Sequence, residues 1–292
     1  MLAAAPDALI TIDSPDFCLR LAGQVKAARP DLCTIHYVAP SVWAWRPGRA
    51  ARMARVIDHV LTLLPFEPPL MTAAGMTADF VGHPVVAEPL GDPLALAGTR
   101  PLVLALPGSR RGEVDRLAPV FGQALGILAQ RSAGLRVALP TLPGLEERLR
   151  SLTAGWPVRP EIILDPARKA DAFAGADVAL AASGTVSLEL AANLCPMVVA
   201  YRMNPLTFWA MRRAALVDTV TLVNLVSGSR TVPEFLGPAC RPAPIAAALE
   251  AVLADPAAQR GAMELTMQRL GRGGEAPGLR AARSVLARIG RG

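Results

Sequence analysis

Short apolar segments alternate with helical patterns along almost the whole of this 292-residue chain, and this alternation restricts its fold more than any other feature. Each apolar segment spans three to six residues, the length of a buried strand, and apolar residues recur at helical spacing between the segments. Strands that alternate with helices form parallel sheets covered by helices, because parallel neighbours need a crossover connection. The sequence therefore predicts an α/β protein with doubly wound parallel sheets.

The alternation falls into two series, separated by a stretch rich in proline and glycine over residues 82–98. Such a density of chain breakers is typical of a linker. We expect a small domain over residues 1–84 and a larger one over residues 85–292, the latter with a helical tail. Two doubly wound domains usually face a cleft that binds the ligand. The expected strands cover residues 8–12, 33–38, 59–63, 79–81, 102–106, 135–139, 161–164, 178–182 and 197–200.

The composition is basic, with a formal net charge of +6, and only two of the 30 basic residues are lysine. A compositional bias and a functional basic surface explain this charge equally well. A functional surface would favour phosphates, diphosphates or an anionic membrane face. Nucleic acid is not expected as a partner, because no basic motif with interleaved aromatic residues occurs.

Cysteine usage and hydropathy favour a reduced, cytoplasmic protein. The four cysteines are scattered without a CxxC pair, which disfavours both a zinc site and a disulfide framework. No apolar run reaches the roughly 18 residues of a membrane span, and the first residues do not resemble a signal peptide. The three histidines lack metal-binding spacing and no Asp-rich motif occurs, so we expect neither a metal nor another cofactor.

The first candidate binding turn is Pro107-Gly-Ser-Arg110, which follows an apolar strand and precedes a helical pattern. Gly108 permits a tight turn, Ser109 can donate to a phosphate oxygen, and Arg110 offers a bidentate guanidinium. An ordinary strand-to-helix turn with a surface arginine is the alternative. We favour a phosphate site.

A second turn of the same kind is Ser183-Gly-Thr185. Its two hydroxyls and the backbone amides at the start of the following helix suit a diphosphate. Glu189 lies one helical turn beyond Thr185, where its carboxylate can accept hydrogen bonds from ribose hydroxyls. A capping turn with an exposed glutamate is the alternative, and for Glu189 the two interpretations are evenly balanced. Two such turns predict a site for a nucleotide diphosphate.

Two carboxylates follow the first strand, in Thr11-Ile-Asp-Ser-Pro-Asp-Phe17. Ligands bind at the carboxyl ends of strands in open α/β sheets, so a carboxylate there can remove a proton from an attacking hydroxyl. The alternative is a helix N-cap. Asp16 fits the N-cap better, and Asp13, nearer the strand, is the better base.

The aromatic residues leave two interpretations open. Trp43 and Trp45 follow the second strand and suit either a sugar or acyl pocket or interdomain packing. For Phe208 and Trp209 we favour core packing. His36 lies inside a strand and is expected to be structural. No GxSxG, Walker A or GxGxxG motif occurs, which disfavours hydrolases, P-loop enzymes and dinucleotide-binding proteins.

In their order along the chain, these motifs resemble the lipid-A-disaccharide synthase family. The match runs from about residue 8 to residue 253. It consists of Ile12-Asp-Ser-Pro-Asp-Phe17, Ile35-His-Tyr-Val-Ala-Pro-Ser-Val-Trp-Ala-Trp-Arg46, Leu64-Pro-Phe-Glu67, Phe80-Val-Gly-His-Pro84, Leu106-Pro-Gly-Ser-Arg110, Ala182-Ser-Gly-Thr185, Cys195-Pro-Met-Val-Val-Ala-Tyr-Arg202 and Thr221-Leu-Val-Asn-Leu225.

The resemblance implies a GT-B-type fold with two Rossmann-like domains, and an inverting glycosyltransferase that uses no catalytic metal. Its substrates would be UDP-2,3-diacylglucosamine and 2,3-diacylglucosamine 1-phosphate, and its products the β-1′,6-linked disaccharide and UDP. Asp13 would be the base. Arg110, Ser183, Gly184, Thr185 and Glu189 would contact UDP with Ser109, and Asn224 would also line the site. Acylated substrates imply peripheral attachment to the cytoplasmic membrane face.

The family normally begins with a further strand and a Gly-Glu-Thr-Ser-Gly-Asp turn, which do not occur in this sequence. The first domain is therefore expected to be truncated, and the chain to have little or no disaccharide synthase activity. The alternatives are a nucleotide-sugar-binding remnant without turnover and a UDP-sugar epimerase of the same fold.

Overall fold

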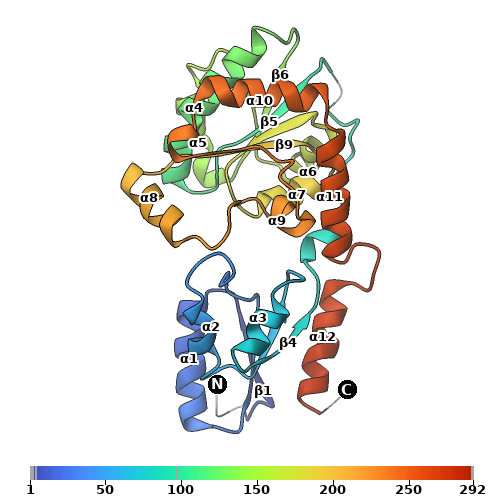
Figure 1. Cartoon of the computed structure of the whole chain (residues 1–292). Helices are drawn as coiled ribbons and strands as arrows, with labels where there is room; N and C mark the ends of the chain where they lie inside the picture. The colour runs from blue at the N-terminus through green and yellow to red at the C-terminus, as the bar shows by residue number, and fades with distance from the viewer. Residues whose placement is uncertain (1–2, 4, 97, 291–292) are drawn as a thin grey trace. The chain divides into compact units, whose positions relative to one another are not determined.

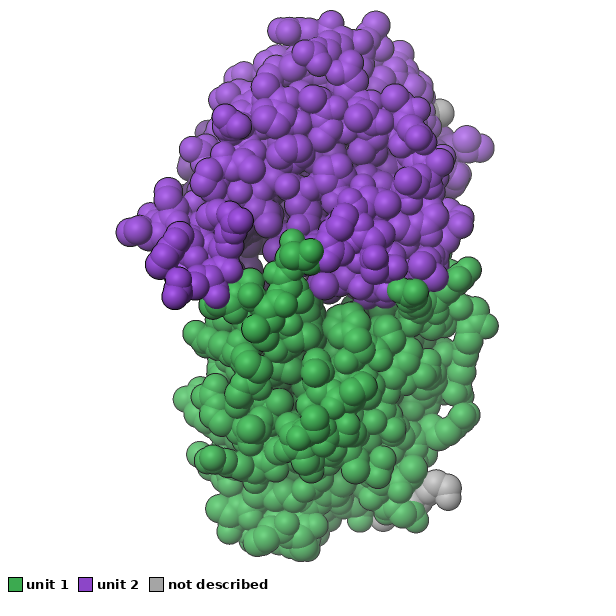
Figure 2. Space-filling view, viewed as in Figure 1, with its two compact units in different colours: residues 1–87, 214–218, 268–292 green, residues 88–213, 219–267 purple. Residues whose placement is uncertain are grey.

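A computed structural model describes residue 3 and residues 5–96 and 98–290 as two compact units (Figures 1 and 2). Unit 1 comprises residues 1–87, 214–218 and 268–292, and unit 2 comprises residues 88–213 and 219–267. Within the described residues, no helix is long and apolar enough to cross a membrane. Both units are α/β structures with parallel sheets, as the alternation of elements predicts.

Unit 1 contains a four-stranded parallel sheet in the order β1-β2-β3-β4. Its strands are β1 (Ala8–Ile12), β2 (Cys33–Tyr37), β3 (His59–Thr62) and β4 (Thr77–Phe80), and its helices are α1 (Pro15–Ala28), α2 (Gly48–Met53), α3 (Pro68–Ala73), η2 (Pro84–Ala87) and α12 (Pro277–Arg288). One sheet face is buried under the apolar sides of α1, α2 and α3. The other contacts α12 through Ala281 and Val285.

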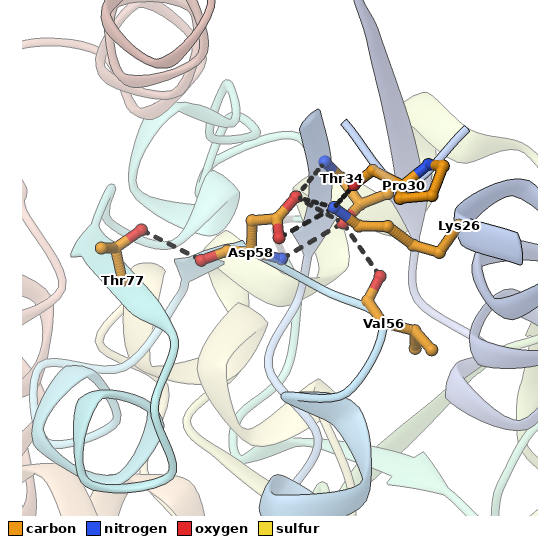
Figure 3. Close-up of polar contacts among 6 residues, drawn as sticks. All are labelled: Lys26, Pro30, Thr34, Val56, Asp58 and Thr77. Atoms are coloured by element: carbon orange, nitrogen blue, oxygen red, sulfur yellow. Dashed lines mark hydrogen bonds and ion pairs between the residues drawn. The ribbon is translucent and has the colours of Figure 1, made fainter. Parts of the chain in front are cut away.

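A polar network closes the amino ends of these strands (Figure 3). The Asp58 carboxylate accepts from the Thr34 amide at 2.8 Å and from the Lys26 ammonium at 2.7 Å. The Thr77 hydroxyl donates to the Asp58 carbonyl at 3.1 Å. Burial opposes ionisation of Asp58, but Lys26 and the Thr34 donors outweigh it and hold the pKa of this carboxyl below its usual range. The network fixes the amino ends of β2, β3 and β4. The expected base, Asp13, lies at the opposite, carboxyl edge of this sheet.

The division of the chain differs from the expected boundary after residue 84, because the last part of the tail belongs to unit 1. Helix α12 is amphipathic and lays its apolar side on the sheet. Its Ser284 hydroxyl lies 2.8 Å from His59 Nε2 and donates to the Asp79 carboxylate at 2.6 Å. Sequence periodicity revealed the helix but not the sheet that it covers, because the two are about 200 residues apart.

Unit 2 contains a six-stranded parallel sheet in the order β10-β9-β8-β5-β6-β7. The short edge strand β10 was not expected from the sequence. The strands are β5 (Leu102–Leu106), β6 (Arg136–Pro140), β7 (Glu161–Ile163), β8 (Val178–Ala181), β9 (Met197–Tyr201) and β10 (Glu234–Leu236). The central strands β5 and β8 are buried along their whole length, which explains their continuous apolar runs.

Helices cover both faces of this sheet. They are α4 (Arg111–Ala129), η3 (Pro143–Leu145), α5 (Glu146–Thr153), α6 (Pro166–Gly175), α7 (Val186–Ala192), α8 (Pro205–Ala214), α9 (Leu222–Ser227), η4 (Gly237–Ala239), α10 (Pro242–Ala254) and α11 (Ala257–Arg269). One hydrophobic core of unit 2 joins α4 and α10 to β5, β6, β8 and β9 around Phe121. This core holds the carboxyl ends of β5 and β8 side by side.

Candidate functional site

The site in unit 2 is a cavity of about 450 Å³ at the carboxyl ends of β5, β6 and β8. Its walls come from residues 108–110, residues 140–142, residues 182–186 and the α6 side chains of Lys169 and Phe173. Strands β5 and β8 are neighbours, with Leu106 opposite Ala181 in the register. The turns that follow these two strands therefore open at the same edge of the sheet and share one hollow.

The first turn is shaped by Gly108, which has a φ of +115°. A Cβ at this position would lie 2.8 Å from Glu113 Cβ, which cannot move without its helix, so both the backbone and the packing require glycine. Ser109 is exposed, and α4 begins directly after Arg110. The Arg110 guanidinium contacts Glu113 Oε1 at 3.1 Å, but its side chain is 82% exposed. A surface ion pair of this kind is weak, so the guanidinium remains available to an anion.

The second turn contains Ser183, Gly184 and Thr185. Gly184 has a φ of +154°, and the following helix α7 begins at Val186. The Thr185 hydroxyl makes no hydrogen bond to the helix that it precedes, and Gly184 and Thr185 are exposed. Residues of this turn and of the first turn line the same cavity. The sequence had predicted that the two turns lie together.

Glu189 also lines the cavity, but it is paired. Lys169 Nζ lies 2.7 Å from Glu189 Oε2 and 5.1 Å from the centre of the Phe173 ring. Lys169 also lines the cavity, and the sequence did not indicate it. Lysine is rare in this arginine-rich chain, and that rarity was the one hint in the sequence. The pairing itself depends on the fold, which places α6 opposite α7.

Asn224 lies elsewhere in unit 2. Its side chain is buried on α9, and its amide donates to the Val232 carbonyl at 3.0 Å and accepts from the Val232 amide at 3.0 Å. It also donates to the Thr219 hydroxyl at 3.2 Å. Asn224 does not line the cavity described above, contrary to expectation, because these contacts use its amide to hold the segment before β10.

Unit 1 carries the expected base at the carboxyl end of β1. Asp13 is exposed, its φ is +50°, and its amide donates to the Tyr37 carbonyl at 2.9 Å. Left-handed backbone at an aspartate is uncommon, and such conformations cluster at functional sites. Asp16 does not cap α1, because Ser14 is the N-cap residue; Asp16 instead pairs with Arg49 at 3.0 Å.

A buried histidine supports this strand end. His36 Nδ1 lies 2.8 Å from the Thr11 hydroxyl, which donates to the Ile35 carbonyl at 3.2 Å. Thr11 therefore accepts from Nδ1–H, and Nε2 is the unprotonated nitrogen. Burial lowers the pKa of His36, although Asp13 opposes this shift, so the ring is neutral. Nε2 has no hydrogen-bond partner among the described residues. The structural role expected for His36 agrees with these contacts.

A buried carboxyl holds the loop after β2. Glu67 accepts from the Trp43 indole at 3.1 Å and from the amides of Leu63 and Leu64 at 3.2 and 3.0 Å. Phe66 packs edge-on against Trp43, with ring centres 5.4 Å apart. Burial raises the pKa of Glu67 to about 7, against the opposing effect of its three donors. Trp43 is thus fixed within unit 1, whereas Trp45 is exposed.

Comparison with known proteins decides the family. A family model described as lipid-A-disaccharide synthetase matches residues 1–282. The lipid-A-disaccharide synthase of Ruegeria pomeroyi is 59% identical over 99% of this chain and 76% of that protein. The corresponding protein of Rhodospirillum centenum is 44% identical over 98% of this chain and 74% of that protein.

The chain belongs to the lipid-A-disaccharide synthetase family.

Solved structures agree with a GT-B fold for this member of the lipid-A-disaccharide synthetase family. MurG from Acinetobacter baumannii superposes with a TM-score of 0.55 at 16% identity, covering 100% of this chain and 75% of MurG. A UDP-GlcNAc 2-epimerase from Neisseria meningitidis, bound to UDP-GlcNAc, gives 0.63 at 12% identity, covering 97% and 77%. At such low identity these likenesses concern the fold alone.

No cluster of three or more metal-ligating side chains occurs in the part of this synthetase-family chain that the structure describes. The four cysteines are free thiols, three of them buried. Core packing fits Phe208 only in part, and it does not fit Trp209, which is 65% exposed on α8. The apolar residues around Trp209 favoured core packing. Composition alone does not show which helices lack a packing neighbour.

Proposed function

We propose that this chain transfers the sugar of UDP-2,3-diacylglucosamine to 2,3-diacylglucosamine 1-phosphate, forming the β-1′,6-linked lipid A disaccharide and UDP. Membership of the lipid-A-disaccharide synthetase family supports the reaction. The observation that carries the site assignment is the convergence of the turns after β5 and β8 on one cavity. Those turns offer hydroxyls, the backbone amides at the starts of α4 and α7, and an exposed guanidinium to a diphosphate.

In this proposal, different walls of the cavity bind the diphosphate, the ribose and the base. Ser109, Arg110 and the second turn, residues 183–185, hold the diphosphate, and the amino end of the 19-residue helix α4 adds a favourable field for its charge. Glu189, oriented by Lys169, accepts hydrogen bonds from the ribose hydroxyls. The apolar wall formed by residues 140–142 and Phe173 suits the flat face of the base.

Asp13 acts as the base on the acceptor sugar. Its carboxylate takes the proton of the 6-hydroxyl as that oxygen attacks the anomeric carbon of the donor and the bond to UDP breaks. Negative charge then builds up on the departing diphosphate. Arg110 and the amides of the two turns stabilise that charge, and stabilisation of developing charge is a main source of rate enhancement in enzymes.

Both substrates carry acyl chains, so the reaction takes place at a membrane surface. We propose that the chain is cytoplasmic and attaches peripherally to the inner membrane, aided by its net positive charge. A UDP-sugar epimerase would need no acylated acceptor. Structures named as UDP-GlcNAc 2-epimerases share the fold at 12–13% identity, whereas the relatives at 59% and 44% identity are named as disaccharide synthases.

The test follows UDP release from the purified chain with both substrates in mixed micelles. Family membership replaces the expectation of little or no activity: we now expect UDP release that requires the acylated acceptor, together with a disaccharide product. An epimerase would change the configuration of the UDP-sugar without acceptor, and a binding remnant would bind UDP without release from the donor. Either result would contradict the proposed transfer.

A further inference from the structure

Helix α8 differs from the other long helices of unit 2 because none of its side chains is buried. It lies outside the layers that cover the sheet (Figure 1). It nevertheless carries large apolar residues: Leu206 is 81% exposed and Trp209 65%, and Met211 is also exposed. A cluster of exposed apolar side chains in one short segment marks an interaction surface.

One residue fixes how α8 is oriented. Phe208 packs on Gly237, where a Cβ atom would lie only 2.6 Å from the Phe208 ring. Leu206, Trp209 and Arg213 are spaced three and four residues apart, so they share a helix face roughly 100–160° from Phe208. The Arg213 guanidinium lies 5.9 Å from the centre of the Trp209 ring. The exposed face therefore presents a leucine, an indole and a guanidinium together.

The charge of this segment is entirely positive. Residues 202–216 contain Arg202, Arg212 and Arg213 and no acidic residue. Within the described ranges, no ion pair joins these three arginines to a carboxylate. Apolar side chains beside uncompensated arginines match a bilayer surface, where tryptophan and leucine enter the acyl boundary while arginine reaches anionic headgroups. A protein partner of ordinary composition would not require this combination.

We propose that the exposed face of α8, formed by Leu206, Trp209 and Arg213, docks on the surface of an anionic phospholipid bilayer. Arg212, about 60° around the helix from Trp209 on the side of Phe208, adds a second positive charge at the edge of this face. This inference rests on the proposed function only in that acylated substrates place the enzyme at a membrane. The docking surface is separate from the UDP cavity, since no residue of α8 lines that cavity.

The test measures cosedimentation of the full chain with vesicles of phosphatidylcholine and phosphatidylglycerol at 7:3. We expect the double variant Leu206→Ser/Trp209→Ser to lower the partition coefficient at least about tenfold, because it removes two inserted apolar side chains. The matched control is Leu94→Ser/Leu279→Ser, which removes two other exposed leucines and should leave binding unchanged. Equal binding by the parent and the α8 variant would overturn the proposal.

A charge pair completes the test. Arg212→Gln/Arg213→Gln should weaken binding to the anionic vesicles about tenfold or more and have little effect with pure phosphatidylcholine. Arg55→Gln/Arg159→Gln, with the same loss of charge at exposed sites elsewhere, should have a much smaller effect. If the α8 variants instead shift the protein from dimer to monomer in sedimentation velocity without changing vesicle binding, a second copy covers this face and the proposal fails.

UDP titration of the same samples separates this inference from the proposed function. All variants above should bind UDP as the parent does, because their residues lie outside the cavity. A parent chain that binds UDP and turns over micellar substrates but ignores vesicles would refute the docking surface alone. A parent that binds vesicles through α8 but not UDP would refute the proposed function alone.

Discussion

Unit 1 and unit 2 place the polar residues of their motifs differently. In unit 2, Ser109, Arg110 and Thr185 lie exposed in the turns after β5 and β8. In unit 1, Thr11, His36 and Glu67 are buried and hold strand ends and loops together. Small residues in a turn thus leave polar groups open to solvent. Polar residues within a strand or beneath a loop instead fix the backbone next to an exposed group such as Asp13.

The largest expected effect concerns Asp13, which is exposed at the carboxyl end of β1 in unit 1. Asp13→Asn should lower the rate of sugar transfer about 10²–10⁴-fold, the usual contribution of a general base. Its affinity for UDP, measured by calorimetry, should stay unchanged because the cavity proposed to hold UDP lies in unit 2. Asp16→Asn, which removes only a surface ion pair with Arg49, is the control and should retain activity. An equal loss of UDP binding in Asp13→Asn would contradict its role as base.

The next effect concerns stability and depends on pH. The pKa of Glu67 is raised to about 7, so the folded state holds a proton that the unfolded state releases near pH 4.5. The stabilising contribution of Glu67 is therefore complete below pH 4.5 and is lost as the pH rises towards 7. Relative to Glu67→Gln, the parent should lose about 3 kcal/mol of unfolding free energy over this interval.

Urea unfolding of both proteins between pH 4.5 and 7.5 measures this difference. Glu88→Gln, at an exposed site, provides the control and should show no comparable trend. A parent that gains stability relative to Glu67→Gln as the pH rises would show that the three donors to Glu67 outweigh its burial.

A smaller effect tests the exposed turns of unit 2. Arg110→Ala should weaken UDP binding by roughly 1.5–3 kcal/mol, the range for a hydrogen bond to a charged group. Arg111→Ala removes the same charge one residue further along, outside the cavity lining, and should cost far less. Calorimetric titration of both variants decides the matter, and equal losses would mean that only net charge attracts UDP.

The smallest effect on binding is expected for Asn224, which resembles the buried polar residues of unit 1. Asn224→Ala should lower the unfolding free energy by about 1–3 kcal/mol, because it leaves the Val232 amide and carbonyl without partners. UDP affinity should fall less than in Arg110→Ala. A larger loss of UDP affinity than of stability would place Asn224 in the site after all.

The sequence predicted the features that depend on local chemistry. Gly108 and Gly184 marked turns between strand and helix, and strand alternation implied that neighbouring turns open at one sheet edge. It did not reveal Lys169 beside Glu189, the three donors to Glu67, or the exposure of Trp209. Each of these depends on which helix lies against which, and residue periodicity carries no information about that pairing.

Helix α12 gives unit 1 an unusual order of assembly. Ile35 and Leu61 on its sheet are covered in part by residues near position 285, which a ribosome adds more than 220 residues later. Until then, one side of the first sheet has no helix to shield it during synthesis. A chain that terminated between α11 and α12 would contain all of unit 2. It would leave the apolar sheet face around Ile35 and Leu61 exposed to chaperones and proteases. Quality control of this enzyme is therefore expected to depend on whether residues 277–288 have been made and have packed on the sheet.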